Sequence, residues 1–533
     1  MEGERQVYIY DTTLRDGTQR EGISLSVEDK LKIAARLDEA GFHYIEGGYP
    51  GSNPKDIEFF RRVGGLGLRR AKIVAFGSTR RPGAATPDAN LIALTDVNTP
   101  CTCIVGKSWL LHVEKVLGTT PEENLRMIGD SVAYLRRAGR EVIYDAEHFF
   151  DGYKHDPSYA MATLRVAREA GADWLVLCDT NGGTLPDAVG AIVRAVGAEL
   201  GFERLGIHTH NDGELAVANT LIAVSAGVRQ VQGTINGYGE RTGNANLCSV
   251  IPNLQIKMGY RCIDDDQLRR LTDLSRYVAE VANLTHDSHL PFVGASSFAH
   301  KAGLHVNAVL KNSHCYEHIP PELVGNRQRI LVSELSGRSN IVVKAQQFGL
   351  DLSDQSIDVR RVLETLKQLE SEGYQFETAE ASFELLIRRL QPDYRPPFEL
   401  VDMIVLVERR QGTRMIAEAT VKVKVGDEIF HTAAVGNGPV NALDAAVRKA
   451  LLQFYPELAS VQLIDYKVRV LDGNDGTAAT VRVSIESSNG KETWGTVGSS
   501  PNIIEASWLA LADSLEYALL KKNRHSADTP VGA

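Results

Sequence analysis

The first half of the chain alternates short apolar runs with longer segments whose apolar residues recur every three or four positions. The short runs are rich in β-branched and aromatic residues, whereas the longer segments have the period of amphipathic helices. The strand-like runs are residues 7–13, 43–49, 72–78, 101–107, 141–147, 174–180, 205–210 and 230–236. Eight such strand–helix units predict a closed (β/α)₈ TIM barrel over residues 1–280.

A doubly wound parallel sheet is the alternative, because it also alternates strands and helices. That fold normally has fewer strands and a glycine-rich phosphate loop after the first strand. The first loop here reads TTLRDGTQ and lacks this signature. Two helix starts are also readable: Ser26 is a predicted N-cap with Asp29 three residues later, and Pro121 is a predicted first helical residue.

The rest of the chain has a different pattern. Residues 281–395 are predicted to be mostly helical, and residues 391–400 carry three prolines in ten positions, which is typical of a linker. Residues 396–533 contain an internal repeat in which strand-like runs lead twice into a helix, with Pro439 and Pro501 at matching places 62 residues apart. We therefore expect a C-terminal α+β domain made of two similar units.

Composition limits the class of partner. Hydrophobic residues make up 43% of the chain and charged residues 24%, as in ordinary globular proteins. The net charge is −10 and both signs are interspersed, which argues against a nucleic-acid partner but not against small anionic ligands. No apolar run approaches the ~20 residues of a membrane span, so no membrane partner is expected.

The expected location is the cytoplasm. The segment MEGERQVYIYDTT is charged from its start and lacks the apolar centre of a signal peptide. The six cysteines, at 101, 103, 178, 248, 262 and 315, contain no CxxC pair. Disulfides and a cysteine-based zinc site are therefore not expected, as suits a reducing compartment.

Polar residues gather where the predicted barrel strands end, which is the edge that carries the chemistry of such barrels. They are Arg15 and Asp16 after the first strand, Glu46, Asp145 with Glu147, Asp179 to Asn181 with Thr180 between them, His208 to Asn211, and Asn236, Glu240, Arg241 and Asn244 after the eighth. A single Asp or Asn after a strand is usually turn chemistry. Six strand ends that converge on one edge favour a site instead.

The segment GIHTHND places His208 and His210 two positions apart on the seventh strand, so their side chains face the same side. Imidazole suits Zn²⁺ or Mn²⁺, and a carboxylate and an amide oxygen would complete a site with open positions. Asp16 and Asn244 are the best candidates for these oxygens. Mg²⁺ with oxygen ligands only is less compatible with two imidazoles.

Three segments in this order, DTTLRDGTQ (11–19), HTHND (208–212) and GTINGYGERTGN (233–244), resemble the signatures of the divalent-metal acyl-CoA condensing and lyase barrels. This superfamily includes the isopropylmalate, homocitrate and citramalate synthases, hydroxymethylglutaryl-CoA lyase and biotin-enzyme carboxyltransferases. The C-terminal repeat resembles the allosteric domain of the synthases, so the likeness spans residues 5–520 and separates the chain from the lyase and the carboxyltransferases. Within the synthases, residues 46–50 read EGGYP and resemble the pyruvate-using branch best. The branch that uses 2-oxoisovalerate, in leucine biosynthesis, is the alternative.

The resemblance implies a Claisen-type condensation of acetyl-CoA with pyruvate, the first step of the pyruvate route to isoleucine. It implies that Asp16, His208, His210 and Asn244 hold a divalent metal (Mn²⁺, Zn²⁺ or Mg²⁺), with Asp16 also facing the substrate. Arg15 is expected to stabilise charge on the carbonyl oxygen, and Thr180 to bind the substrate carboxylate.

The same resemblance implies that part of the site comes from a second subunit. In the synthases the histidine of a GxH element crosses to the neighbouring subunit, and here that histidine is His305 in FAHKAGLHVNA (298–308). His300 is the alternative base or a structural residue. Glu147 is expected to orient or relay to the base, or else to form an ion pair at the barrel mouth. Tyr316 is expected to complete the borrowed site, or else to pack, and the enzyme is expected to be a homodimer.

The turns before the two repeat helices, GNGP and GSSP, leave backbone N–H groups free to receive a carboxylate. The resemblance implies isoleucine as the effector bound there, or leucine for the alternative branch. A domain that only joins two subunits is the other interpretation.

Overall fold

The computed structural model describes residues 6–333, 335–350, 358–409 and 415–527. The chain divides into two compact units, residues 1–298 with 319–328 and residues 299–318 with 329–533. Each unit has its own hydrophobic core. Among the described helices, none combines the length and the apolar character needed to cross a membrane.

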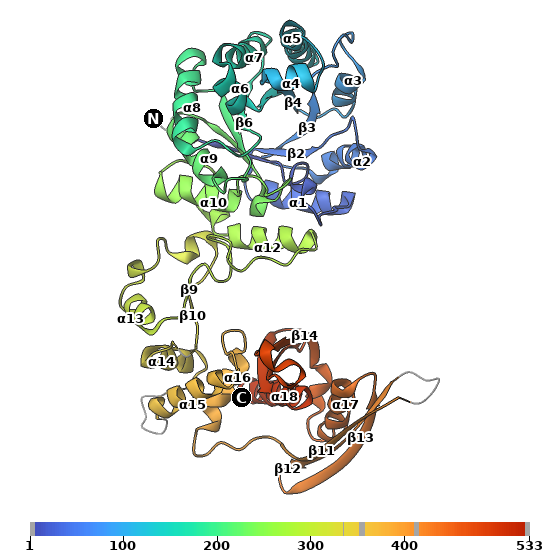
Figure 1. The fold of residues 1–533 in the computed structure, drawn as a ribbon, viewed down its shortest axis with the longest axis vertical. Helices are drawn as coiled ribbons and strands as arrows, with labels where there is room; N and C mark the ends of the chain where they lie inside the picture. Colours follow the sequence, from blue (N-terminus) through green and yellow to red (C-terminus); the bar gives the residue numbers. More distant parts are fainter. Residues whose placement is uncertain (1–5, 334, 351–357, 410–414, 528–533) are drawn as a thin grey trace, which may run out of the picture. The chain divides into compact units, whose positions relative to one another are not determined.

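The first unit is a closed barrel of eight parallel strands in sequential order, with helices around the outside (Figure 1). Its strands are β1 (Tyr8–Asp11), β2 (Tyr44–Gly48), β3 (Lys72–Ser78), β4 (Cys101–Lys107), β5 (Glu141–Glu147), β6 (Trp174–Asp179), β7 (Leu205–Thr209) and β8 (Gln230–Gly233). Strand β1 pairs with β2 on one side and with β8 on the other, which closes the cylinder. The predicted TIM barrel is therefore confirmed, and the doubly wound sheet is excluded.

The sequence predicted the start of two helices in this unit, whose described residues form twelve α-helices that follow the strands or close the unit. They are α1 (Val27–Glu39), α2 (Pro54–Val63), α3 (Ala89–Asp96), α4 (Leu110–Lys115), α5 (Pro121–Arg137), α6 (Phe149–His155), α7 (Pro157–Glu169), α8 (Pro186–Leu200), α9 (Ala216–Ser225), α10 (Leu247–Pro252), α11 (Asp265–Leu268) and α12 (Leu271–Val281). Ser26 and Asp29 form a reciprocal capping box at α1, and Pro121 is the first residue of α5 behind the N-cap Thr120. Both predicted starts are confirmed: the Ser26 and Thr120 side chains accept from backbone donors that a helix leaves free, and Pro121 has no N–H that would need a partner.

The second unit begins with short helical segments. A two-stranded parallel sheet joins β9 (Ala299–His300) to β10 (Arg329–Ile330). The helices are α13 (Gly303–Lys311), α14 (Arg338–Gln347), α15 (Val359–Ser371) and α16 (Glu380–Arg389). The predicted linker over 391–400 overlaps β11, which starts at Glu399. The cross-strand pairing of Glu399 and Leu400 with β12 extends the sheet into the end of this proline-rich stretch.

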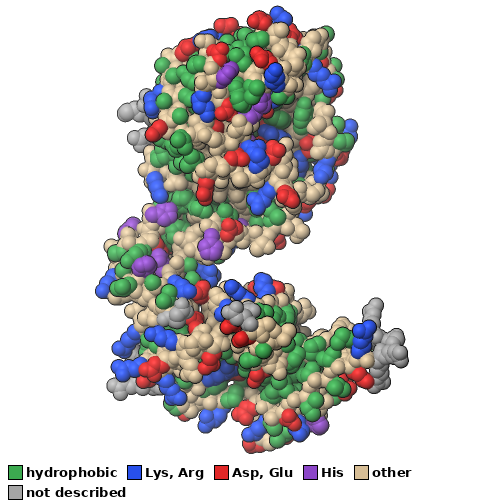
Figure 2. All heavy atoms as spheres, viewed as in Figure 1, with side chains coloured by type: hydrophobic (Ala, Val, Ile, Leu, Met, Phe, Trp, Pro, Cys, Tyr) green, Lys and Arg blue, Asp and Glu red, His purple; other side chains and the backbone are tan. Residues whose placement is uncertain are grey.

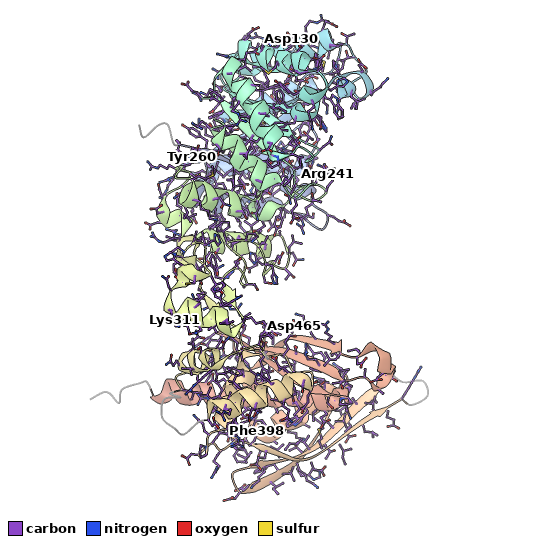
Figure 3. All side chains as sticks on the ribbon, turned by 60° about the vertical axis from the view of Figure 1, so that its left-hand side comes forward. Asp130, Arg241, Tyr260, Lys311, Phe398 and Asp465 are labelled. Atoms are coloured by element: carbon purple, nitrogen blue, oxygen red, sulfur yellow. The ribbon has the colours of Figure 1, made fainter. Side chains whose placement is uncertain are left out.

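The predicted repeat is present as two antiparallel three-stranded sheets, each followed by a helix. The first has β11 (Glu399–Glu408), β12 (Ile416–Val425), β13 (Glu428–Gly436) and α17 (Pro439–Leu451), and the second has β14 (Gln462–Val470), β15 (Val481–Ser488), β16 (Thr493–Ser500) and α18 (Ile503–Ala527). In Figure 3 the label Phe398 lies at the start of the first repeat and the label Asp465 lies in the second. The match of the two prolines is inexact, because Pro439 begins α17 whereas Pro501 precedes the first residue of α18 by two positions.

One face of the first of these sheets is not covered within the described residues. Val401, Ile404 and Leu406 of β11 and Ile429 and Val435 of β13 are exposed although they are large and apolar. Figure 2 shows green hydrophobic side chains gathered over this part of the second compact unit. The opposite face packs on α17 through buried residues such as Val421 and Leu443. An apolar face of this kind is typical of a protein–protein interface.

Candidate active site

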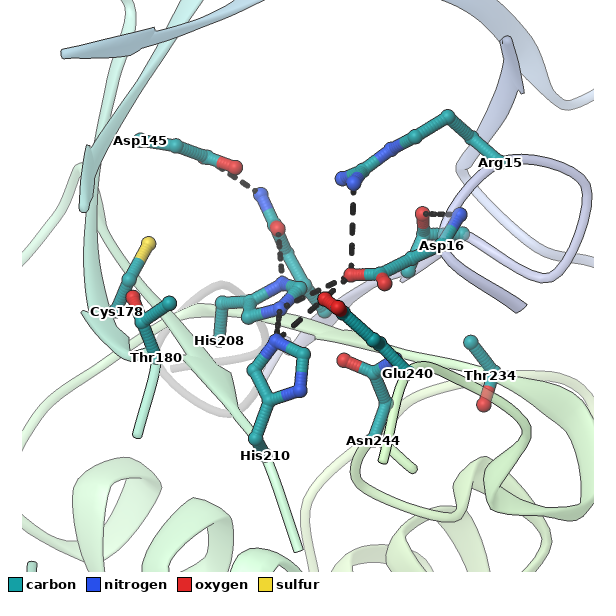
Figure 4. A network of polar contacts seen from close by, with 12 residues as sticks. Arg15, Asp16, Asp145, Cys178, Thr180, His208, His210, Thr234, Glu240 and Asn244 are labelled. Atoms are coloured by element: carbon teal, nitrogen blue, oxygen red, sulfur yellow. Dashed lines mark hydrogen bonds and ion pairs between the residues drawn. The ribbon is translucent and has the colours of Figure 1, made fainter. Parts of the chain in front are cut away.

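Asp16, His208 and His210 form a compact buried cluster at the carboxyl ends of β1 and β7 (Figure 4). The two histidine Nε2 atoms lie 3.2 Å apart. Oδ2 of Asp16 lies 3.4 Å from Nε2 of His208 and 3.9 Å from Nε2 of His210. One ligand atom from each residue fits within 4.8 Å, so the three side chains are placed to share one small cation.

Asn244 supplies a fourth donor beside this cluster. Its Nδ2 donates to the carbonyl of Tyr238 at 3.2 Å, and its backbone pairs with that of His210. Its buried Oδ1 has no hydrogen-bond partner among the described residues, and Figure 4 shows it pointing toward the cluster. A buried oxygen without a partner is costly, so it is well explained as a ligand atom. Two imidazole nitrogens and two oxygens fit a divalent metal with open positions.

Two of the three charge states in the cluster suit a cation. Burial tends to lower the pKa of His208, but Asp16 and Asp145 outweigh it and raise that pKa, so a cation would have to replace a proton on this ring. Burial by itself raises the pKa of Asp16, but Arg15 and His208 outweigh it and hold that pKa well below its usual range. Burial, together with His208, lowers the pKa of His210 to about 3, so this imidazole keeps its lone pair near neutral pH. Metal ligation requires an ionised carboxylate and a neutral imidazole of this kind.

Gln232 on β8 orients His208, and it is absent from the residues that the sequence singles out. Its Oε1 lies 2.9 Å from Nδ1 of His208, while its Nε2 donates to Asp145 at 3.0 Å. The donation to Asp145 turns the amide oxygen toward His208, so His208 carries its proton on Nδ1 and its Nε2 faces the cluster. The signal in the sequence is a pair of polar residues, Gln230 and Gln232, two positions apart on a predicted barrel strand. All four residues of β8 are buried in the structure.

Arg15 is held rigidly at the end of β1. Its Nε donates to Oε2 of Glu46 at 2.7 Å, and its guanidinium lies 3.8 Å from the ring centre of Phe76. Glu46 is fully buried and also accepts hydrogen bonds from Tyr10 and Thr12. Burial tends to lower the pKa of Arg15, but Glu46 and Asp16 outweigh it and raise that pKa, so the guanidinium stays charged. A fixed cation beside the cluster can stabilise a developing oxyanion.

A cavity of about 260 Å³ opens over these groups. Its polar walls include Arg15, Asp16, Thr180, Glu147 and the two cluster histidines. Its apolar walls are Phe76, Val105 and Cys178, from β3, β4 and β6. The volume lies below the roughly 300–1,000 Å³ of sites for drug-sized ligands, so the cavity suits a small substrate.

The structure gives Thr180 and Glu147 further partners. The Oγ1 of Thr180 accepts from the backbone N–H of His148 at 2.9 Å, and its carbonyl accepts from Arg241 at 2.7 Å. Glu147 forms an ion pair with Lys107 at the adjacent strand end. The ion pair expected as one interpretation of Glu147 is therefore present, and the same side chain lines the cavity.

His305 and Tyr316 belong to the second compact unit, so the barrel cavity and these residues lie on different units of the fold. Their rings stack with centroids 4.2 Å apart, and both side chains are exposed. His300 is buried instead, and its Nε2 lies 3.1 Å from Oε1 of Glu317. The geometry favours a structural role for His300 and leaves His305 accessible.

Comparison with known proteins covers most of the chain. Residues 6–278 match the HMGL-like family model, residues 292–374 the homocitrate synthase post-HMGL domain-like model, and residues 377–519 the LeuA allosteric (dimerisation) domain model. An (R)-citramalate synthase of Aquifex aeolicus is 54% identical over 97% of this chain and 98% of its own length. One of Geobacter sulfurreducens is 56% identical over 97% and 98%.

A 2-isopropylmalate synthase is a more distant relative. That of Methanocaldococcus jannaschii is 31% identical over 97% of this chain and 96% of its own length. The sequence-based preference for the pyruvate-using branch is thus confirmed over the alternative. The chain belongs to the (R)-citramalate synthase family, with a barrel of the HMGL-like type.

Proposed function

We propose that this protein condenses acetyl-CoA with pyruvate and hydrolyses the resulting thioester, giving (R)-citramalate and free CoA. The observation that carries the proposal is the cavity in which Arg15 and the Asp16–His208–His210 cluster face the same space. The full-length identity of 54–56% with (R)-citramalate synthases supports the choice of substrates. Phe76 and Val105 are apolar walls of this cavity, and we assign them to the methyl group of pyruvate.

The chemistry divides among the residues as follows. Asp16, His208, His210 and Asn244 would hold a divalent metal, which when bound polarises the ketone of the 2-oxo acid. Arg15 stabilises the negative charge that develops on the ketone oxygen as the new carbon–carbon bond forms. The Thr180 hydroxyl, already positioned by the backbone of His148, receives the substrate carboxylate.

A base must remove a proton from the acetyl methyl group before it attacks the ketone carbon. We assign this role to His305 of a second subunit, with Tyr316 stacked on it and Glu147 as the relay at the barrel mouth. Water then hydrolyses the thioester, the thiolate leaves as CoA, and the former ketone oxygen ends as a hydroxyl. The exposed apolar face of β11 and β13 supports a homodimer, as does the match to a dimerisation domain.

We also propose isoleucine as a feedback effector of the C-terminal domain. Gly438, the N-cap of α17, has no side chain to satisfy the first helical N–H groups, which leaves them for a ligand carboxylate. Calorimetry of the full chain with isoleucine, and separately with leucine, tests this. Isoleucine is expected to bind and to lower the rate; binding of neither amino acid contradicts the effector role.

The deciding experiment follows free CoA with acetyl-CoA and each of pyruvate, 2-oxoisovalerate and 2-oxoglutarate. Pyruvate is expected to be the preferred substrate, with activity lost on chelation and restored by Mn²⁺, Zn²⁺ or Mg²⁺. Preference for 2-oxoisovalerate contradicts the proposal.

A second experiment tests the site shared between subunits. Inactive Arg15→Ala and His305→Ala chains are mixed to form mixed dimers. Recovered activity supports the shared site, and absence of activity in proven mixed dimers contradicts it.

A further inference from the structure

A second group of polar side chains, one buried and two partly buried, lies next to Glu147 and outside the Asp16–His208–His210 cluster. It consists of Trp109 and His112 on the segment after β4 and His148 directly after β5. The rings of His112 and His148 have centroids 4.2 Å apart, and Trp109 stacks on His112 at 5.3 Å. Nε1 of Trp109 and Nδ1 of His112 are buried without a hydrogen-bond partner among the described residues, whereas Nδ1 of His148 faces the Asp151 carboxylate at 3.5 Å. Such atoms lower stability, so this arrangement needs an explanation other than stability.

The backbone of His148 is also unusual. It adopts the left-handed conformation, with φ 54° and ψ 34°, which is uncommon for a residue with a Cβ. Glycine would adopt it without strain, whereas here a large ring is present and buried. Strained residues of this kind cluster at functional sites when the surrounding structure holds them in place.

His148 is the junction of three strand ends that line the cavity. It follows Glu147 of β5, whose carbonyl accepts from the N–H of Ser108 after β4 at 3.2 Å. Its own N–H donates to Thr180 after β6 at 2.9 Å. The left-handed turn therefore fixes where Glu147 leaves its strand and where the Thr180 hydroxyl points.

Helix α6 contacts the same three strand ends. A Cβ on Gly152 would lie only 2.3 Å from the carbonyl oxygen of Ser108, so the helix backbone touches the corner after β4 directly. Asp151 lies 3.5 Å from Nδ1 of His148 and accepts from Asn181 at 2.8 Å. The corners after β4, β5 and β6 are thus locked to one another around the His148 ring.

We propose that His148 is a positioning residue: its left-handed backbone and docked ring hold Glu147 and Thr180 at the mouth of the cavity. The inference rests on the proposed function, in which those two side chains act on the substrates. His148 touches no reacting atom itself. Trp109, His112 and the close approach of Gly152 supply the surface on which its ring and turn are held.

The test compares His148→Ala, His148→Asn and Gly152→Ala with the matched control His155→Ala, an exposed histidine on the same helix. In His148→Ala we expect kcat to fall about tenfold or more, because small misplacements of acting groups are costly. His148→Asn, which tolerates the left-handed backbone, should recover part of kcat. Gly152→Ala should resemble His148→Ala, and His155→Ala the wild type. Mn²⁺ affinity, measured by calorimetry, should be unchanged in all four.

Hydrogen exchange of residues 147–155 gives a readout that is independent of activity. We expect faster exchange in His148→Ala and Gly152→Ala and normal exchange in the control. Wild-type kcat and exchange in both His148→Ala and Gly152→Ala overturn the inference, and so does a loss of Mn²⁺ binding in parallel with activity. If the wild type releases no CoA from acetyl-CoA and pyruvate, the proposed function fails, while the exchange comparison still decides whether His148 holds this corner.

Discussion

Arg15 donates from Nε to Oε2 of Glu46 over 2.7 Å, and this carboxylate is fully buried. Phe76 packs against the guanidinium at 3.8 Å, and Asp16 lies 3.5 Å from its Nη1, so the guanidinium is held facing the cavity. Glu46 is therefore one of the groups that fix the position of the Arg15 guanidinium.

Glu46→Gln is expected to lower both activity and stability. It removes the closer of the two buried carboxylates that pair with Arg15, the other being Asp16 at 3.5 Å, and breaking a buried pair typically costs about 3–5 kcal/mol. Chemical denaturation and kcat measure the two effects. Glu39→Gln is the control, because Glu39 pairs with Arg36 on the surface, where pairs contribute only about 0–1 kcal/mol. Equal effects of both substitutions would contradict the assigned role of Glu46.

Gln232→Leu is expected to weaken metal binding by roughly 10–100-fold, the usual effect of removing a group that orients a ligating histidine. Without the amide oxygen, Nδ1 of His208 loses its partner and the ring is free to turn. Titration calorimetry with Mn²⁺ measures the affinity. Gln255→Leu serves as control, because Gln255 donates to the Asp265 carboxylate and accepts from the N–H of Ile263, away from His208. An unchanged Mn²⁺ affinity in Gln232→Leu would contradict the inference that Gln232 orients His208.

Val105→Ala is expected to shift the preference from pyruvate toward 2-oxo acids with longer side chains. Val105 is an apolar wall of the 260 Å³ cavity, and each methylene of space changes discrimination by about 1–3 kcal/mol. The ratio of kcat/KM for 2-oxobutyrate and pyruvate measures the change. Val116→Ala, at an exposed site, should leave the ratio as it is. A ratio that does not rise in Val105→Ala would contradict the role of Val105 in limiting the size of the 2-oxo acid.

The ionised carboxylate of Asp38 is expected to stabilise the barrel, and this stabilisation should be lost at acid pH. Its carboxylate accepts from the N–H groups of Arg69, Arg70 and Ala71 at 2.9, 2.8 and 2.7 Å. Burial tends to raise its pKa, but these three bonds outweigh it and lower the pKa below the ordinary 3.8. A lowered folded-state pKa means that the stabilisation is complete above about 3.8 and is lost as the pH falls through the folded-state value.

Denaturation of the wild type and Asp38→Asn between pH 7 and 3 checks this expectation. The variant should be less stable by about 1–3 kcal/mol at pH 7, as for other lost hydrogen bonds to buried groups. The difference should shrink in the acid range. A difference that stays constant with pH would show that ionisation of Asp38 is not its cause.

The local pattern of the sequence determined the barrel, the starts of α1 and α5, and the pairing of two histidines in the buried Asp16–His208–His210 cluster. Strand and helix periods are properties of neighbouring residues, and capping by Ser26 and Asp29 or by Thr120 needs only a few adjacent positions. His208 and His210 could be paired because two residues on one strand share a face. The resemblance of three ordered motifs then gave the family.

The tertiary structure alone decided what surrounds those residues. Gln232 contacts His208 from another strand, 24 positions away, and Glu46 contacts Arg15 across 31. Lys107 pairs with Glu147 because β4 and β5 are neighbours in a closed cylinder, and the same closure joins the three corners at His148. These contacts depend on strand order and register rather than on local preference, so no short stretch of sequence contains them.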